Sequence, residues 1–89
     1  MYLLYTEDKK NLAGIVSRYF QGAKIQRGLV GIWQGQTEKA ASIMIANTDK
    51  NHDPKEEQGR VHLLAKAIKA KNNQSSVLIV HVQNDAYLI

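Results

Sequence analysis

The stretch from Lys24 to Asn47 constrains the fold more than any other part of this sequence. It contains two strand-like runs separated by Gln34-Gly35-Gln36-Thr37, and a short glycine-containing segment between two such runs is typical of a β-hairpin. Trp33, the single tryptophan of the chain, directly precedes this turn. Since the apolar face of a hairpin must be buried against other elements, we expect the remaining segments to pair with it or to cover it.

Within this hairpin, the alternation of side chains assigns residues to the two faces of the sheet. Ile25, Leu29 and Trp33 are predicted to share one face, because their spacings are even. Gly28, inside the outgoing strand, indicates a β-bulge or a bend. The return strand is predicted over residues 40–47.

The first helix is predicted from a stripe of apolar residues at helical spacing. Thr6-Glu7-Asp8 supplies a capping hydroxyl or carboxylate and two acids for the N-terminus of this helix. Gly22 is expected to end the helix as a left-handed cap. The stripe itself recurs at i, i+3, i+4, i+7 and i+8. It consists of Leu12, Ile15, Val16, Tyr19 and Phe20.

A second helix is predicted to begin at Pro54, the single proline. Proline suits the first turn of a helix, and Asp53 is placed to cap it. The expected buried stripe is Val61, Leu64, Ala65 and Ile68. Two further runs, Tyr2–Tyr5 and Val77–Val82, are predicted to be the first and the last strand.

The order strand, helix, strand, strand, helix, strand predicts one α+β domain over residues 1–89. This is the ferredoxin-like βαββαβ arrangement, with a four-stranded antiparallel sheet and both helices on one face. Val77–Val82 is apolar at positions that point to both faces, whereas a sheet face exposed to water is usually polar. We therefore expect the second face to be buried in a homo-oligomer.

The hairpin resembles that of the CutA proteins, which belong to the PII-like group of small ferredoxin-like trimers. The resemblance rests on Trp33-Gln34-Gly35, on Glu38, and on the return strand that ends with Ile43-Met44-Ile45. The short turn of this chain has no room for the long loop of PII proteins. The resemblance implies a homotrimer with clefts between its subunits.

Charge and composition narrow the expected location and partners. The chain has 12 Lys and Arg, a net charge of +4 and no cysteine, so thiol catalysis, disulfides and thiolate zinc sites are excluded. No apolar run approaches the roughly 20 residues that span a bilayer, and the first residues do not form a signal peptide, so we expect a cytoplasmic protein without membrane partners. Five bases and no acid lie between Lys9 and Gln36, which predicts a region of positive potential.

The first functional hypothesis follows from this potential and from the CutA and PII resemblance. It is a small non-enzymatic regulatory or ligand-sequestering protein that binds a small anionic molecule, such as a nucleotide, at inter-subunit clefts. Arg18, Lys24 and Arg27 would supply positive charge, and Trp33 would supply a stacking surface. Glu38, at the same edge of the hairpin, is the fifth candidate ligand-binding residue.

Three other hypotheses are open. The chain is alternatively a protein-interaction or inhibitory module that uses its basic face. Binding of single-stranded nucleic acid ranks third, with bases stacked on Tyr2, Tyr5 and Trp33. An enzyme ranks last, because no nucleophile–base pair and no phosphate-binding or dinucleotide-binding motif is visible, and no cofactor is indicated.

One polar loop contains potential metal ligands. Asp49, His52 and Asp53 are close in sequence and carry the oxygen and imidazole groups that bind divalent ions. A solvated loop that enters the second helix, with Asp53 as its cap, explains the same residues without a metal. We therefore predict no metal site from this loop.

Overall fold

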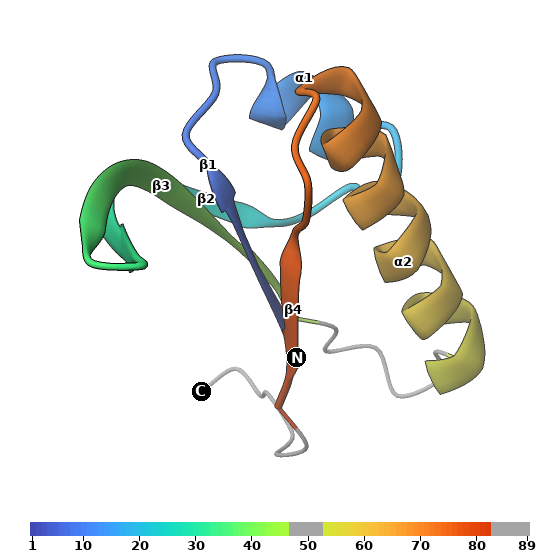
Figure 1. Ribbon diagram of the computed structural model, residues 1–89. Coiled ribbons are helices and arrows are strands. Elements are labelled where there is room, and N and C mark those ends of the chain that lie inside the picture. Colours follow the sequence, from blue (N-terminus) through green and yellow to red (C-terminus); the bar gives the residue numbers. More distant parts are fainter. Residues whose placement is uncertain (47–52, 83–89) are drawn as a thin grey trace.

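The computed structural model describes residues 1–46 and 53–82. Within these ranges the chain forms an α+β domain with a four-stranded antiparallel sheet and two helices (Figure 1). The strand order across the sheet is β2-β3-β1-β4, and all three strand pairs are antiparallel. The elements are β1 (Tyr2–Glu7), α1 (Leu12–Val16), β2 (Lys24–Trp33), β3 (Gln36–Ile45), α2 (Pro54–Lys71) and β4 (Leu78–His81).

The core lies between one face of the sheet and the two helices. Leu4 of β1 and Ile43 of β3 are fully buried, as is Leu64 of α2. Leu12, Ile15 and Val16 bring α1 into the same cluster. The second face of the sheet points away from both helices (Figure 1). The core therefore forms on one side of the sheet.

Helix α2 confirms its prediction from sequence. It starts at Pro54, and Asp53 Oδ1 accepts a hydrogen bond from the backbone N–H of Lys55 at 3.0 Å, as an N-cap does. Its buried residues are Val61, Leu64, Ala65 and Ile68. A proline, a capping residue and an apolar stripe agree here, which explains why the start and the buried face of this helix are predictable.

Helix α1 is shorter than predicted, and both of its predicted caps are wrong. It ends at Val16, and the chain continues in tight turns in which the Tyr19 N–H donates to the Val16 carbonyl at 3.0 Å. Asn11 occupies the N-cap position without a side-chain capping bond, and the Asp8 carboxylate is instead bonded to β2. Gly22 is not left-handed; in the described residues, positive φ among glycines occurs at Gly28 and Gly35.

A β-bulge divides β2 into two segments. Gln26 pairs with Ser42, whereas Leu29 pairs with Ala40, so β2 contains one residue more than β3 over this interval. Gly28 has a φ of 74° within the bulge, which confirms the irregularity predicted there. The prediction that Ile25 shares a face with Leu29 is wrong, because the additional residue reverses the alternation. Ile25 faces the core and Leu29 faces the opposite side.

The turn of the hairpin is tighter than predicted. Trp33 pairs directly with Gln36, so the loop consists of Gln34 and Gly35 alone. Their φ values are 51° and 76°, and two consecutive positive φ values are the signature of a type I′ turn. The end of the hairpin projects beyond the helices (Figure 1). Strand β3 therefore starts before the predicted Ala40.

Strand β4 is shorter than predicted and lies at an edge of the sheet beside β1. Its last residue, His81, stacks on Tyr2 with ring centroids 4.2 Å apart and ring planes 6° apart. Tyr2 is 5% exposed, and this burial raises its pKa, with a smaller contribution from the negative charge of Glu57. Among the described helices, none has the length and apolar character of a membrane span.

Candidate functional site

The face of the sheet opposite the helices, here named the open face, carries apolar side chains. Tyr5 pairs with Leu78, and Leu3 pairs with Val80, so these four residues form two adjacent rows on this face. Tyr5 is 40% exposed, Leu78 is 59% exposed and Val80 is 36% exposed. No described residue covers these rows.

A cavity of about 540 Å³ opens where the end of β1, the β2–β3 hairpin and the α2–β4 loop meet. This size is within the range of pockets that hold small molecules. Its lining combines apolar residues with a few polar groups. The lining residues are Tyr5, Thr6, Glu7, Leu29, Val30, Gly31, Ile32, Glu38, Ala40, Gln74, Ser75, Ser76 and Leu78.

Two carboxylates belong to this cavity, and no Lys or Arg is among its described lining residues. Glu7 pairs with Ala40, and Glu38 is two residues from Ala40 along β3, so all three lie on the open face. Glu7 forms an ion pair with Lys9 at 3.9 Å, but both side chains are about half exposed, so this pair contributes little. The cavity therefore favours a cationic group on its ligand.

The position of Glu38 depends on the glycine opposite it. Gly31 pairs with Glu38 across the hairpin. A Cβ atom at Gly31 would lie 3.3 Å from Glu38 Cγ, which is tighter than most real contacts, and 3.5 Å from Glu38 Oε1, which is an ordinary van der Waals distance. Because Gly31 has no side chain, the Glu38 side chain can lie next to the Gly31 backbone.

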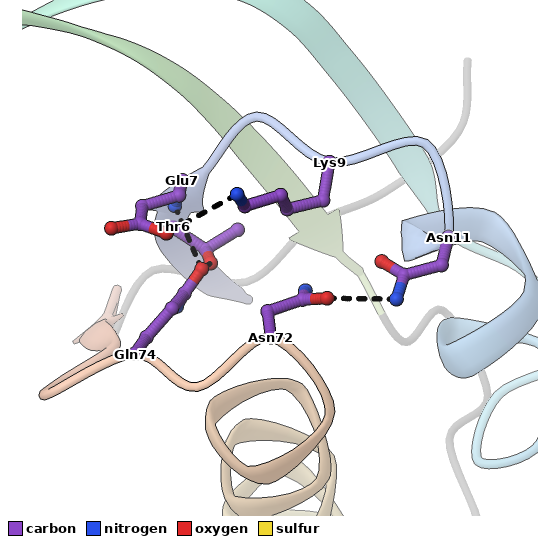
Figure 2. A network of polar contacts seen from close by, with 6 residues as sticks. All are labelled: Thr6, Glu7, Lys9, Asn11, Asn72 and Gln74. Carbon is purple, nitrogen blue, oxygen red and sulfur yellow. Dashed lines mark hydrogen bonds and ion pairs between the residues drawn. The ribbon is translucent and has the colours of Figure 1, made fainter.

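The α2–β4 loop is joined to the end of β1 by the side chain of Gln74 (Figure 2). Asn73 has a φ of 52°, and the Gln74 N–H donates to the Lys69 carbonyl at 3.0 Å, as in a Schellman helix ending. Gln74 Oε1 then accepts from Thr6 Oγ1 at 2.7 Å and from the Glu7 N–H at 3.2 Å. This network holds Glu7 against the loop that forms one wall of the cavity.

A second contact, also drawn in Figure 2, joins the two helix ends near this wall. Asn11 Nδ2 donates to Asn72 Oδ1 at 2.7 Å. Asn11 precedes α1 and Asn72 follows α2, so the bond links the loop after β1 to the end of α2. The cavity wall is therefore supported from both helices.

Asp8 anchors the bulge of β2 beside the cavity. Its carboxylate accepts from Arg27 Nε and from the Gly28 N–H, the latter at 3.1 Å. The hydrogen bond from Arg27 holds the pKa of Asp8 below its usual value, and partial desolvation opposes this shift. The hydrogen bond from Gly28 and the positive charges of Arg27 and Lys39 lower the pKa further. These bonds connect the loop after β1 to the base of the projecting hairpin.

Within the single chain, the five residues predicted from sequence as ligand-binding are distributed over several places. Glu38 lines the cavity on the open face, whereas Arg18 lines a separate groove of about 230 Å³ between α1 and α2. Arg27 is paired with Asp8. Lys24 begins β2 opposite Met44, and Trp33 ends β2 opposite Gln36.

Two residues of the cavity were missed. Glu7 matches the composition of a helix start, but it is the last residue of β1 and its face is set by pairing with Ala40. Gln74 lies in a polar loop without periodicity, so no sequence pattern distinguishes it. The alternation of Leu3, Tyr5 and Glu7 would have indicated the longer strand.

The positions of the described residues also bear on the nucleic-acid hypothesis and on the polar loop with potential metal ligands. Tyr2 is buried against His81, so it is not exposed for stacking on a nucleic-acid base. Asp49 and His52 lie outside the described residues, and Asp53 is the N-cap of α2. In residues 1–46 and 53–82, no group of three or more potential metal ligands comes together.

Comparisons with known proteins identify the fold but no family. No protein-family model matches the sequence, and no curated protein is similar to it. A solved structure described as a phage SAM lyase in the apo state is similar, with a TM-score of 0.70 and 21% sequence identity. The match covers 88% of this chain and 74% of that chain. At this identity the similarity establishes a shared fold.

Proposed function

We propose that this chain binds S-adenosylmethionine (SAM) in the cavity on the open face and cleaves it as a lyase. The observation that supports this most is the pair Glu7 and Glu38, which lie in a largely apolar cavity on the fold of a SAM lyase. SAM combines a sulfonium cation, an ammonium group and an adenine ring. The carboxylates suit its cations, and Tyr5, Leu29 and Leu78 suit the flat ring.

The reaction needs no nucleophile from the protein, so the missing nucleophile–base pair does not count against it. In an elimination, the electron pair of one carbon–sulfur bond moves to the sulfur, which leaves as a neutral thioether. The carbon adjacent to the one that carried the sulfur loses a proton, and the electron pair of its carbon–hydrogen bond forms a carbon–carbon double bond between these two carbons. A carboxylate such as Glu38 accepts this proton, a role that typically contributes about 10²- to 10⁴-fold in rate.

The test is incubation of the purified protein with SAM, followed by mass spectrometry of the products. The expected products are an uncharged thioether and an unsaturated fragment, and their masses identify which carbon–sulfur bond is broken. Glu38→Gln should lower the rate about 100-fold or more, because glutamine cannot accept the proton. Glu56→Gln, on α2 and outside the described cavity, is the matched control. Absence of both SAM loss and thermal stabilisation by SAM would reject the proposal.

We also propose that the domain is ferredoxin-like and assembles as a homotrimer with the open faces inward. The strand order and the position of both helices on one face support the first part. The exposed apolar rows of the open face support an oligomer, and the resemblance to CutA and PII-like proteins supports three subunits. The cavity lies at one end of this face, so a neighbouring subunit would complete it as an inter-subunit cleft.

Binding of a small anionic molecule is a second candidate function, at a different place. The groove between α1 and α2 contains Arg18, Tyr19 and Lys71, which combine two cations with an aromatic ring. These groups suit a phosphate attached to a flat base. Calorimetry with ATP and with inorganic phosphate tests this, and Arg18→Ala should weaken any binding at this groove. No heat with either compound would reject it.

A further inference from the structure

Gln74 has an amide group that the described protein uses only in part. Its side-chain oxygen accepts two hydrogen bonds, but Nε2 is enclosed and has no partner among the described residues. The orientation of the amide is set by Glu7, because a backbone N–H can only donate and must therefore face the oxygen. An enclosed donor without an acceptor is unfavourable, so such a group calls for an explanation.

The surroundings of this amide match the needs of an amino-acid zwitterion. Gln74 lines the cavity together with Ser75 and Ser76, whose hydroxyl groups are further donors. The Glu7 backbone is bonded to the Gln74 side chain, and Glu7 lines the same cavity. The hydrogen-bond donors of the protein are complementary to the carboxylate of an amino acid, and the carboxylate of Glu7 is complementary to its ammonium group.

We propose that this corner of the cavity recognises the α-amino-acid end of the ligand. Gln74 Nε2 donates to the α-carboxylate, and the Glu7 carboxylate accepts from the α-ammonium group. This inference rests on the proposed function and adds a specificity determinant to it. Because Nε2 is enclosed in the free protein, this contact requires a local rearrangement of the cavity wall around Gln74.

The assignment leaves a separate role for the second carboxylate. Glu7 on β1 pairs with Ala40 on β3, and Glu38 is two residues from Ala40 along β3. Gln74 lies in the loop that follows α2. With the amino-acid end held at Gln74 and Glu7, the sulfonium and its adjacent carbons extend along the cavity toward Glu38. Binding and proton transfer are thus assigned to different carboxylates.

The experiment compares two ligands on the wild-type protein by calorimetry. SAM carries the α-carboxylate, and decarboxylated SAM lacks it while keeping the sulfonium, the amine and the adenosine. We expect SAM to bind about 10- to 100-fold more tightly, which corresponds to one hydrogen bond to a charged group. A second measurement uses Gln74→Glu, which keeps the acceptor for Thr6 and Glu7 but replaces the donor with a carboxylate oxygen.

For Gln74→Glu we expect the preference for SAM to be lost or reversed, because the new carboxylate repels the α-carboxylate of the ligand. Gln21→Glu makes the same charge change at an exposed residue outside the described cavity and should keep the wild-type preference. Thermal denaturation of both variants checks folding. Should Gln74→Glu fail to fold, Gln74→Met removes the donor without adding charge and should abolish the preference.

The outcomes separate this inference from the proposed function. If the wild type cleaves SAM but binds both compounds equally, the Gln74 assignment is wrong and the lyase proposal stands. If Gln74→Glu keeps the full preference for SAM, the assignment is also wrong. If the wild type binds neither compound, the lyase proposal fails and the assignment fails with it.

Discussion

At the scale of single residues, the most informative position is one without a side chain. Gly31 faces Glu38 across the hairpin, and its missing Cβ leaves room for the Glu38 side chain. Its φ is not in the left-handed region, so the backbone would accept alanine. The constraint on this glycine is therefore steric, and it acts through the neighbouring carboxylate.

Gly31→Ala should weaken SAM binding about tenfold while the protein remains folded, because the Glu38 carboxylate must move by a fraction of an ångström. Calorimetry gives the affinity, and urea denaturation gives the free energy of unfolding. Gly59→Ala on α2 is the matched control, since a Cβ there meets nothing within 4 Å. It should leave binding unchanged and stabilise the helix by about 0.5–1 kcal/mol. Equal SAM affinity in Gly31→Ala and the wild type would contradict the proposed role of this glycine.

Residue-level roles in the cavity were only partly predictable. Glu38 was predicted as a ligand-binding residue because it lies at the edge of the hairpin, and this edge can be located from glycine and tryptophan in the sequence. Glu7 was assigned to a helix, because Thr-Glu-Asp has the composition of a helix start whether or not a strand continues through it. Gln74 acquires its role from a contact with Thr6, 68 residues away in the chain, and local patterns carry no information on such a pair.

At the scale of elements, the bulge of β2 and the loop after β1 form one unit. Asp8 accepts from Arg27 and from the backbone of Gly28, and the Asp8 N–H donates to the Lys39 carbonyl at 3.2 Å. One residue thus contacts both strands of the hairpin at its base. Helix α2 was predictable because its proline, its capping residue and its apolar stripe all indicate the same helix. The bonding of Asp8 to the hairpin was not predictable, because it depends on contacts between segments that are distant in the sequence.

The depressed pKa of Asp8 predicts that its contribution to stability depends on pH. The contribution should be complete above the ordinary aspartate value of 3.8 and should be lost as the pH falls through the lower pKa of the folded protein. Asp8→Asn should therefore be less stable than the wild type at pH 7, and the difference should shrink below pH 3.8. Urea denaturation across this range measures the difference in free energy of unfolding.

Asp53→Asn supplies the control for this series, because asparagine caps a helix about as well as aspartate. Its stability at pH 7 should be close to that of the wild type. A constant difference between Asp8→Asn and the wild type from pH 7 down to pH 2 would show that the charge of Asp8 is not what stabilises the bulge.

At the scale of the whole molecule, the two faces of the sheet differ. One face is buried beneath both helices, and the open face carries Leu3, Tyr5, Leu78 and Val80. The order of the elements allowed this asymmetry to be predicted, because two helices on one side leave the other side uncovered. The number of subunits does not follow from the order, since any partner with an apolar surface can cover such a face.

Val80→Glu should dissociate the proposed trimer, because it places a charge in an apolar interface. Val80 is 36% exposed in the single chain and does not line the described cavity, so the fold should survive. Ligand binding should weaken, because the neighbouring subunit that completes the cavity is lost. Sedimentation velocity should show the wild type near three times the chain mass of 10.0 kDa and the variant near that mass. Leu63→Glu on α2, where Leu63 is 55% exposed, should leave the assembly intact. A wild-type protein that sediments as a monomer at micromolar concentration would reject the oligomer.

The bulge in β2 makes the hairpin sensitive to length rather than to composition. Removal of one residue at Arg27 or Gly28 would leave two unfavourable choices. The strand would either keep its pairing beyond Leu29 and turn Ile25 out of the core, or keep Ile25 inside and lose the register of the Gln34-Gly35 turn. Among descendants of this chain, substitutions in this segment should accumulate far more readily than single-residue insertions or deletions.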